Sequence, residues 1–193
     1  MKLREIAEIK SGYLFRFRLR SDKDGAVKVI QLKDVNEDGY LNIDGIYSVD
    51  FTPSKRTEFL QKGDVLFKAK SNKHVAAVFD SDMENVIATV HYFILRIKNI
   101  SILPEFLRWY LNEKPAQKYF DFNAAGTRIP IINKKALEKL EIPGVSLEKQ
   151  KKVVAVYELL RREQVLMDNI KDKREKLVSW LLIDSIKNIN TGG

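Results

Sequence analysis

Three short segments of this sequence combine basic side chains with amide or hydroxyl groups. Lysine and arginine neutralise phosphates, whereas asparagine, serine and threonine can exchange hydrogen bonds with the edges of bases. The segments contain Arg16, Arg18 and Arg20; then Lys68, Lys70, Ser71, Asn72, Lys73 and His74; and then Thr127, Arg128, Asn133, Lys134 and Lys135. We predict that these residues contact a nucleic acid. For the first segment, a solvated loop or strand edge is an equally good interpretation.

No recognisable catalytic constellation accompanies these segments. The chain has no cysteine, which excludes disulfides, thiolate catalysis and cysteine-based zinc sites. His74 and His91 stand in β-like runs, where a structural role is commoner than metal binding. Asp64 lacks the second carboxylate that a metal-dependent nuclease needs. Glycine-rich phosphate and cofactor loops are missing as well, so we expect a non-catalytic chain without cofactor or metal.

Composition fits a folded protein with an anionic partner. The 193 residues carry a formal net charge of +8, which favours nucleic acid or an anionic membrane surface. Hydrophobic residues make up 45% of the chain, more than a disordered protein would carry. The N-terminus lacks the apolar core of a secretory signal, and no run approaches the ~20 apolar residues of a membrane span. We therefore expect a cytoplasmic protein with no membrane partner.

Short β-like runs dominate the first half of the chain. A short amphipathic helix is predicted over residues 2–9, where apolar residues have helical spacing before Ser11 and Gly12. Residues 27–98 then alternate β-like runs with turns such as Asn36 to Gly39, and few helices separate them. Parallel strands need long crossovers, so we expect an antiparallel or mixed sheet. The runs are VKVIQL, YLNI, GIYSV, DVLFKAK, HVAAVF and VIATVHYFILRI.

Helical patterns return after residue 98. They occupy LPEFLRWYLNE, PAQKYFDF and KKALEKLEIP, and we expect the first two of these helices to pack on the sheet. The pair Pro143 and Gly144 is the best domain boundary. The sequence thus predicts an α+β domain over residues 1–145, which would carry the three basic segments.

Residues 146–188 contain neither proline nor glycine and predict one helix of some 60 Å. Mostly apolar positions along it recur at alternating steps of three and four, as in a coiled coil, and two of these positions hold the charged residues Glu163 and Arg174. The predicted seam consists of Val153, Val156, Leu160, Met167, Ile170, Leu177 and Leu181. The helix could instead lie back on its own domain, but a radius of gyration of roughly 15 Å for that domain argues that part of it projects and pairs with another helix. Residues 189–193 are expected to form a disordered tail.

Several segments together resemble one half of a specificity (S) subunit of type I restriction-modification systems. LREIAEIKSGYLFR is similar to the family's entry helix, glycine turn and aromatic residue, and VIQLKDVNEDGYL to its strand and turn. FLQKGDVLFKAK, with Gly63 and Asp64, is similar to the segment in which glycine-aspartate precedes an apolar strand. HYFILRIKN with LPEFLRWYLN, and AAGTRIPIINKKALEKLEIPGVSLEKQKKVV with its Gln150, are similar to the late strand, the helix and the closing segment.

The resemblance implies a target-recognition domain that reads one half of a split site in double-stranded DNA. It also implies a helical spacer that docks methyltransferase (modification) subunits and, through them, the restriction subunit. Full family members carry two recognition domains and two helical regions, whereas this chain has one of each. We therefore expect a homodimer or pairing with a second specificity half. The rival interpretations are a coiled-coil adaptor that binds protein and, less favoured, a nuclease with an unfamiliar site.

Overall fold

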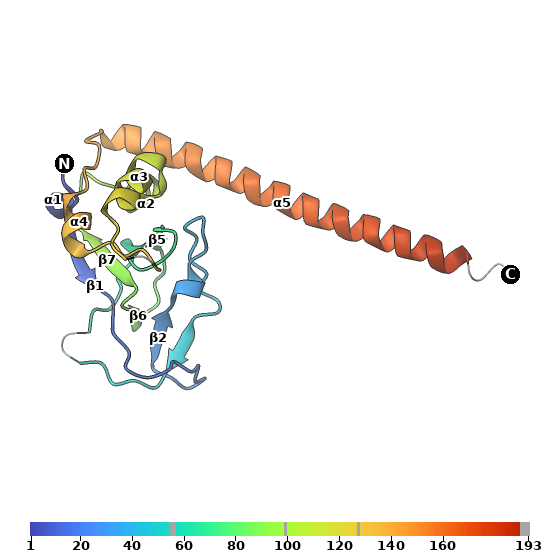
Figure 1. Cartoon of the computed structure of the whole chain (residues 1–193), viewed down its shortest axis with the longest axis horizontal. Coiled ribbons are helices and arrows are strands. Elements are labelled where there is room, and N and C mark those ends of the chain that lie inside the picture. The colour runs from blue at the N-terminus through green and yellow to red at the C-terminus, as the bar shows by residue number, and fades with distance from the viewer. Residues whose placement is uncertain (55–56, 99, 127, 190–193) are drawn as a thin grey trace. The chain divides into compact units, whose positions relative to one another are not determined.

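The computed structural model describes residues 1–54, 57–98, 100–126 and 128–189 (Figure 1). Contacts within the chain divide it into two compact units, residues 1–151 and residues 152–193. The first unit has α+β architecture, and the second consists of most of a long C-terminal helix. This agrees with the fold class expected from the sequence. None of the described helices is long and apolar enough to cross a membrane.

The larger sheet of the first unit is antiparallel throughout. Its strands lie in the order β1 (Ala7–Ser11), β7 (Tyr92–Ile97), β4 (Asp64–Lys68) and β5 (Ala76–Phe79). The helix predicted over residues 2–9 is wrong in its second half, because α1 covers only Leu3–Ile6. Ala7 and Ile9 are buried on the same face of β1 and pair with Ile97 and Leu95 of β7. Pairing with a neighbouring strand thus overrides the short helical pattern.

The smaller sheet is mixed and has the order β3 (Tyr47–Val49), β2 (Val27–Ile30) and β6 (Val86–Ala88). β2 runs antiparallel to β3 and parallel to β6. The predicted strand YLNI forms only a single bridge between Val35 and Leu41. The segment comes directly after a turn in which the Asn36 side chain accepts hydrogen bonds from the N–H groups of Asp38 and Tyr40. The run VIATVHYFILRI is divided at Thr89 to His91, so that it supplies one strand to each sheet.

Three helices accompany the sheets, at the positions that the sequence predicts: α2 (Pro104–Asn112), α3 (Lys114–Asn123) and α4 (Lys134–Lys139). α2 packs on β5 and β4, and α4 packs on α1. Figure 1 shows α2 and α3 beside the larger sheet. The Asn112 side chain exchanges two hydrogen bonds with the backbone of Ala76, at 2.8 and 2.9 Å, so α2 is attached to the edge strand of that sheet.

The principal core contains residues of both sheets. Ile30, Val86 and Ala88 of the smaller sheet join Leu66, Phe79 and Ile94 of the larger one in a single buried cluster. A second cluster covers the other face of the smaller sheet, where Val27, Val29, Val49 and Ile87 meet partly buried aromatic residues of the segment after β1. The smaller sheet is therefore held on both faces, and this fixes the ends of its strands.

Asp64 is the buried member of an ion pair at the start of β4. Gly63 before it has a φ of 89°, a conformation that favours glycine. The carboxylate of Asp64 is 2% exposed and accepts hydrogen bonds from Arg96 at 3.0 and 2.7 Å and from the N–H of Gln61 at 2.8 Å. Hydrogen bonding to Asp64 raises the pKa of Arg96 above its ordinary value. The glycine-aspartate motif is thus structural, and it joins β4 to β7.

Gln150 fastens the first turn of α5 (Leu147–Ile189) to the first unit. It is fully buried. Its Nε2 donates to the carbonyls of Ser101 and Val145 at 2.7 and 2.9 Å, and its Oε1 accepts from the N–H of Leu103 at 2.9 Å. One side chain therefore satisfies three backbone groups in the segment that leads into α2 and in the segment before α5.

In the second unit, α5 continues as an uninterrupted helix. The predicted limits, 146–188, differ by one residue at each end, within the normal variation of helix assignment. Along the predicted seam Val153 is half-buried and the other six residues are exposed, with Leu160 58% and Leu177 56% accessible. Apolar side chains exposed in such number are typical of interaction surfaces. The predicted tail lies outside the described residues except for Ile189, which is helical.

Candidate nucleic-acid interface

The structure brings the second and third basic segments together. The N–H of Ile132 donates to the carbonyl of Ala69 at 2.9 Å, and Lys70 forms a β-bridge with Ile131. On these adjoining loops the predicted contact residues Lys70, Asn72, Lys73, Arg128, Asn133, Lys134 and Lys135 are exposed, and Ser71 is half-buried. Thr127, also predicted to contact nucleic acid, lies outside the described residues. The two loops thus present a common cationic surface.

Lys68 and His74 are corrections to the predicted set, because both are buried, with 7% and 3% of their surfaces exposed. The ammonium of Lys68 donates to the carbonyl of Val35, and burial lowers its pKa. His74 stacks on Phe67, and its Nδ1 lies 2.9 Å from the carbonyl oxygen of Lys68. Every residue of β4 is buried, so the end of this strand is interior to the fold. These two side chains support the loop and do not reach its surface.

Asn133 is exposed but already has a structural task. It is the N-cap residue of α4, and its side-chain oxygen accepts a hydrogen bond from the N–H of Ala136 at 2.9 Å. Asparagine is among the preferred residues at this position because its side chain satisfies a free N–H of the first turn. Of the side chains on the second and third segments that could read bases, Asn72 is the more available.

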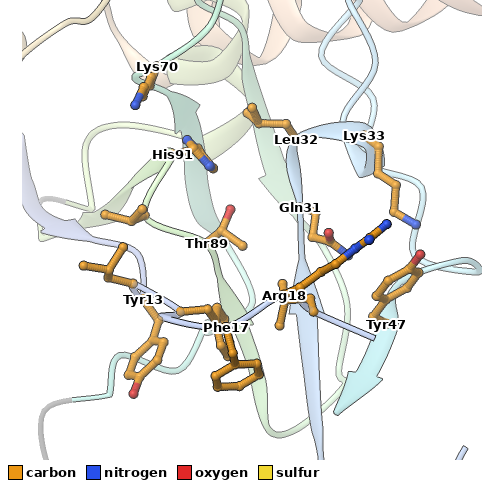
Figure 2. A pocket seen from close by; sticks show the side chains of 14 residues that line it. Tyr13, Phe17, Arg18, Gln31, Leu32, Lys33, Tyr47, Lys70, Thr89 and His91 are labelled. Atoms are coloured by element: carbon orange, nitrogen blue, oxygen red, sulfur yellow. The ribbon is translucent and has the colours of Figure 1, made fainter. Parts of the chain in front are cut away.

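The first basic segment contributes Arg18 to a pocket that Lys70 also lines (Figure 2). Arg16, Arg18 and Arg20 are all exposed, as predicted for a basic loop. The pocket has a volume of about 660 Å³ and lies where β2 and β6 end. Aromatic residues of the segment after β1, among them Tyr13, Phe15 and Phe17, form one side of it.

Parallel pairing of β2 and β6 creates this pocket. Parallel strands end at the same edge of a sheet, so Gln31 after β2 and Thr89 after β6 come side by side, and the N–H of Thr89 donates to the carbonyl of Ile30 at 3.0 Å. Tyr13 continues the sheet, because its N–H donates to Ala88 at 2.7 Å and its carbonyl accepts from Val90 at 2.8 Å. Backbone hydrogen bonds thus fix the positions of Gln31 and Thr89, the polar residues that follow the two strands.

The charged side chains that line the pocket are all cationic: Arg18, Lys33 and Lys70. The Lys33 ammonium lies 3.8 Å from the centre of the Tyr47 ring, a cation–π arrangement. Burial, and then the nearby Lys70, lower the pKa of His91, so its imidazole is neutral at pH 7. Elsewhere among the described residues, no group of three or more acidic or histidine side chains is placed to hold a metal ion.

Sequence reasoning missed Gln31, Lys33, Tyr47, Thr89 and His91 as pocket residues. A usable signal was present, since polar side chains follow the apolar runs VKVI and VIA. Bringing them together requires the parallel pairing of strands about 55 residues apart, which a strand-by-strand interpretation of the sequence does not supply.

Gly12→Ala tests how the aromatic segment is held. A Cβ on Gly12 would lie 2.2 Å from the carbonyl oxygen of Thr89, a backbone atom, so the segment must shift. We expect a loss of about 1–3 kcal/mol in the free energy of unfolding, measured by urea denaturation. Gly45→Ala is the matched control, because nothing lies within 4 Å of a Cβ there. Equal stability of the two variants would contradict the tight approach.

Comparison with known proteins decides the family. The protein-family model of the type I restriction modification DNA specificity domain matches residues 1–173 of this chain. The chain belongs to this family. No curated protein sequence matches it significantly.

Solved structures of type I systems share the fold of this specificity domain. The S subunit of the type I restriction-modification system from M. genitalium superposes with a TM-score of 0.56 at 17% identity, over 84% of this chain and 38% of that one. The HsdS subunit of Thermoanaerobacter tengcongensis gives a TM-score of 0.56 at 19% identity, over 84% of this chain and 36% of that one. A chain from a study of complex assembly and conformational transition of the type I R-M system gives a TM-score of 0.72 at 17% identity, over 100% of this chain and 50% of that one. This chain thus spans half or less of each.

Proposed function

We propose that this chain is a sequence-specific DNA-binding specificity subunit that reads one half of a split site. The observation that carries the proposal is the family match, which runs from the first residue through the α+β unit into α5. The exposed cationic loops around Lys70 and Arg128, together with Arg18 at the pocket, supply the charge that DNA binding needs. Residues 1–145 are the recognition domain in this proposal, and residues 146–188 are the spacer.

Catalysis in this proposal belongs to partner chains. The specificity chain places methyltransferase subunits, and through them the restriction subunit, on the recognised sequence. The exposed apolar faces of α5 are the docking surface, since they offer both the seam and further side chains such as Leu166 and Trp180, 56% and 60% accessible. The chain itself uses no cofactor.

Dimerisation through the seam would complete the recognition unit. Two copies related by a two-fold axis would present two identical domains and read an inverted repeat, with a spacer length that the helices set. A second specificity half with a different domain would instead give an asymmetric site. Glu163 and Arg174, at seam positions, are the residues that would fix the register of the helices.

Lys70→Ala and Asn72→Ala separate phosphate binding from base reading on the same loop. We expect Lys70→Ala to weaken binding to every duplex and to reduce the slope of log K against log salt by roughly one. Asn72→Ala should change sequence preference and leave the salt slope as it is. Fluorescence anisotropy over a salt series measures both, with Lys176→Ala on α5 as the control. Unchanged binding by both loop variants would remove this loop from the interface.

The proposed function is tested by co-purifying the chain with its methyltransferase and mapping the methylated motif. A bipartite inverted repeat with a fixed unspecified spacer is the expected result for a homodimer. DNA binding without salt dependence, or none at all, would favour the coiled-coil adaptor. Divalent-metal-dependent cleavage by the purified chain alone would favour the nuclease.

A further inference from the structure

The pocket at the ends of β2 and β6 contains buried polar atoms that have no hydrogen-bond partner among the described residues. These atoms are Nε2 of Gln31, Oγ1 of Thr89 and Nδ1 of His91, and all three residues line the pocket. Thr89 is 93% buried, being 7% exposed. Buried polar groups in folded proteins are normally paired. Three unpaired groups in one pocket point to a ligand that pairs with them.

The unpaired atoms define the hydrogen bonds that such a ligand makes. The Gln31 amide nitrogen donates, the Thr89 hydroxyl donates or accepts, and the neutral His91 ring can do either at Nδ1 according to its tautomer. Figure 2 shows these three side chains in the same part of the pocket, with the Thr89 hydroxyl between the other two residues. Mixed donors and acceptors of this kind match the edge of a nucleic-acid base, and glutamine pairs well with adenine.

The remaining walls suit the rest of a nucleotide. Phe17 is 56% exposed and packs edge-on against Phe15, with ring centres 5.5 Å apart, so one of its faces is free for stacking. Arg18, Lys33 and Lys70 place positive charge on the lining, and none of the lining residues carries a carboxylate. A planar base and an anionic phosphate are the two groups that these walls favour.

We propose that this pocket binds a single nucleotide, with its base edge against Gln31, Thr89 and His91 and its phosphate near Arg18, Lys33 and Lys70. The volume of about 660 Å³ lies within the range of small-molecule sites, about 300–1,000 Å³. Two sources share this chemistry: a nucleotide turned out of the target duplex, which rests on the proposed function, and a free mononucleotide. A nucleotide of the duplex has to leave its stack to enter.

The first arm of the test uses a library of random duplexes. The full chain, Gln31→Leu and Thr89→Val are each used to select bound sequences, with Gln61→Leu at an exposed glutamine as the matched control. We expect both pocket variants to select the wild-type motif except at one base pair, where discrimination falls about 5- to 150-fold. 2-Aminopurine at that position should gain fluorescence with wild-type protein and not with Gln31→Leu.

The second arm titrates the chain with dAMP, dGMP, dCMP and dTMP, and with inorganic phosphate, while NMR follows the His91 ring and the backbone of residues 12–19. Shifts that a mononucleotide causes, and that Thr89→Val and Arg18→Ala abolish, identify a free nucleotide as the source. Arg18 is exposed, so its replacement leaves the fold intact, and thermal unfolding checks each variant. Shifts that phosphate alone reproduces would overturn the base-binding part of the proposal.

The outcomes separate this proposal from the proposed function. If the pocket variants keep the full motif and no mononucleotide shifts the pocket signals, the proposal is overturned while DNA recognition stands. A motif that changes without a gain in 2-aminopurine fluorescence, while no mononucleotide shifts the pocket signals, overturns it too, because the base then remains stacked and no free nucleotide binds. If wild-type protein selects no motif, the proposed function fails, and the mononucleotide titration alone decides the pocket.

Discussion

Asp64→Ala is expected to lower the free energy of unfolding by about 2–4 kcal/mol, because it removes a buried carboxylate and leaves the half-buried Arg96 guanidinium with Glu58 and the carbonyl of Phe59 as partners. The carboxylate of Asp64 is 2% exposed and holds Arg96 in a two-pronged hydrogen bond. For a chain of this size such a loss lowers Tm by roughly 4–16 °C. Scanning calorimetry or urea denaturation followed by circular dichroism measures it.

Asp82→Ala is the control for this experiment. Asp82 pairs with Lys62 at 3.1 Å, but its side chain is 86% exposed, and pairs of that kind contribute little. The double variant Asp64→Ala, Arg96→Met should be less destabilised than the sum of its parts, since each single substitution already removes the interaction that the two residues share. A loss at Asp64 no larger than at Asp82 would show that the pair does not hold β4 to β7.

Leu160→Asp is expected to raise the dissociation constant of the proposed dimer by about 10²- to 10⁴-fold. Burying a leucine contributes about 1.5–3 kcal/mol, and a two-fold interface contains each residue twice. The side chain is 58% exposed within the chain, so the substitution should leave the first unit folded. Sedimentation equilibrium across micromolar concentrations measures the change, and Leu177→Asp should act in the same direction.

Leu159→Asp separates the seam from general apolar character. Leu159 is 65% exposed and neighbours Leu160, but it lies about 100° around the helix and off the predicted seam. We expect it to change dimerisation little. Equal effects of the two substitutions would refute the seam as drawn, and wild-type chain that stays monomeric at micromolar concentration, with or without methyltransferase, would refute the dimer.

Local patterns predicted most of the elements because they depend on neighbours in sequence. The runs that became β4 and β5, and the helices begun near Pro104 and Pro115, needed only periodicity and helix-start signals. The prediction failed for residues 7–9, where alternation of period two and pairing with β7 compete with a helical spacing. The same residues fit both a helical and a strand pattern, and the pairing with β7 decides in favour of the strand.

The candidate site was only partly predictable for the same reason. Lys70, Asn72 and Arg128 are basic or amide residues in loops, and composition alone finds them. Lys68 and His74 belong to the same basic segment, but they are buried, and their burial depends on what covers β4. Gln31 and Thr89 meet only because β2 and β6 are parallel, a long-range pairing that no short window of sequence contains.

The parallel ends of β2 and β6 also bear on how such a protein could evolve. Ile30 and Ala88, the last strand residues, are fully buried, whereas the next residues, Gln31 and Thr89, line the pocket. One peptide bond thus separates side chains that form the core from side chains that line the pocket. If the pocket binds a nucleotide as proposed, a single nucleotide substitution in the codon for Gln31 would alter ligand preference on an unchanged scaffold. Lineages with this architecture would therefore acquire new preferences in small, viable steps.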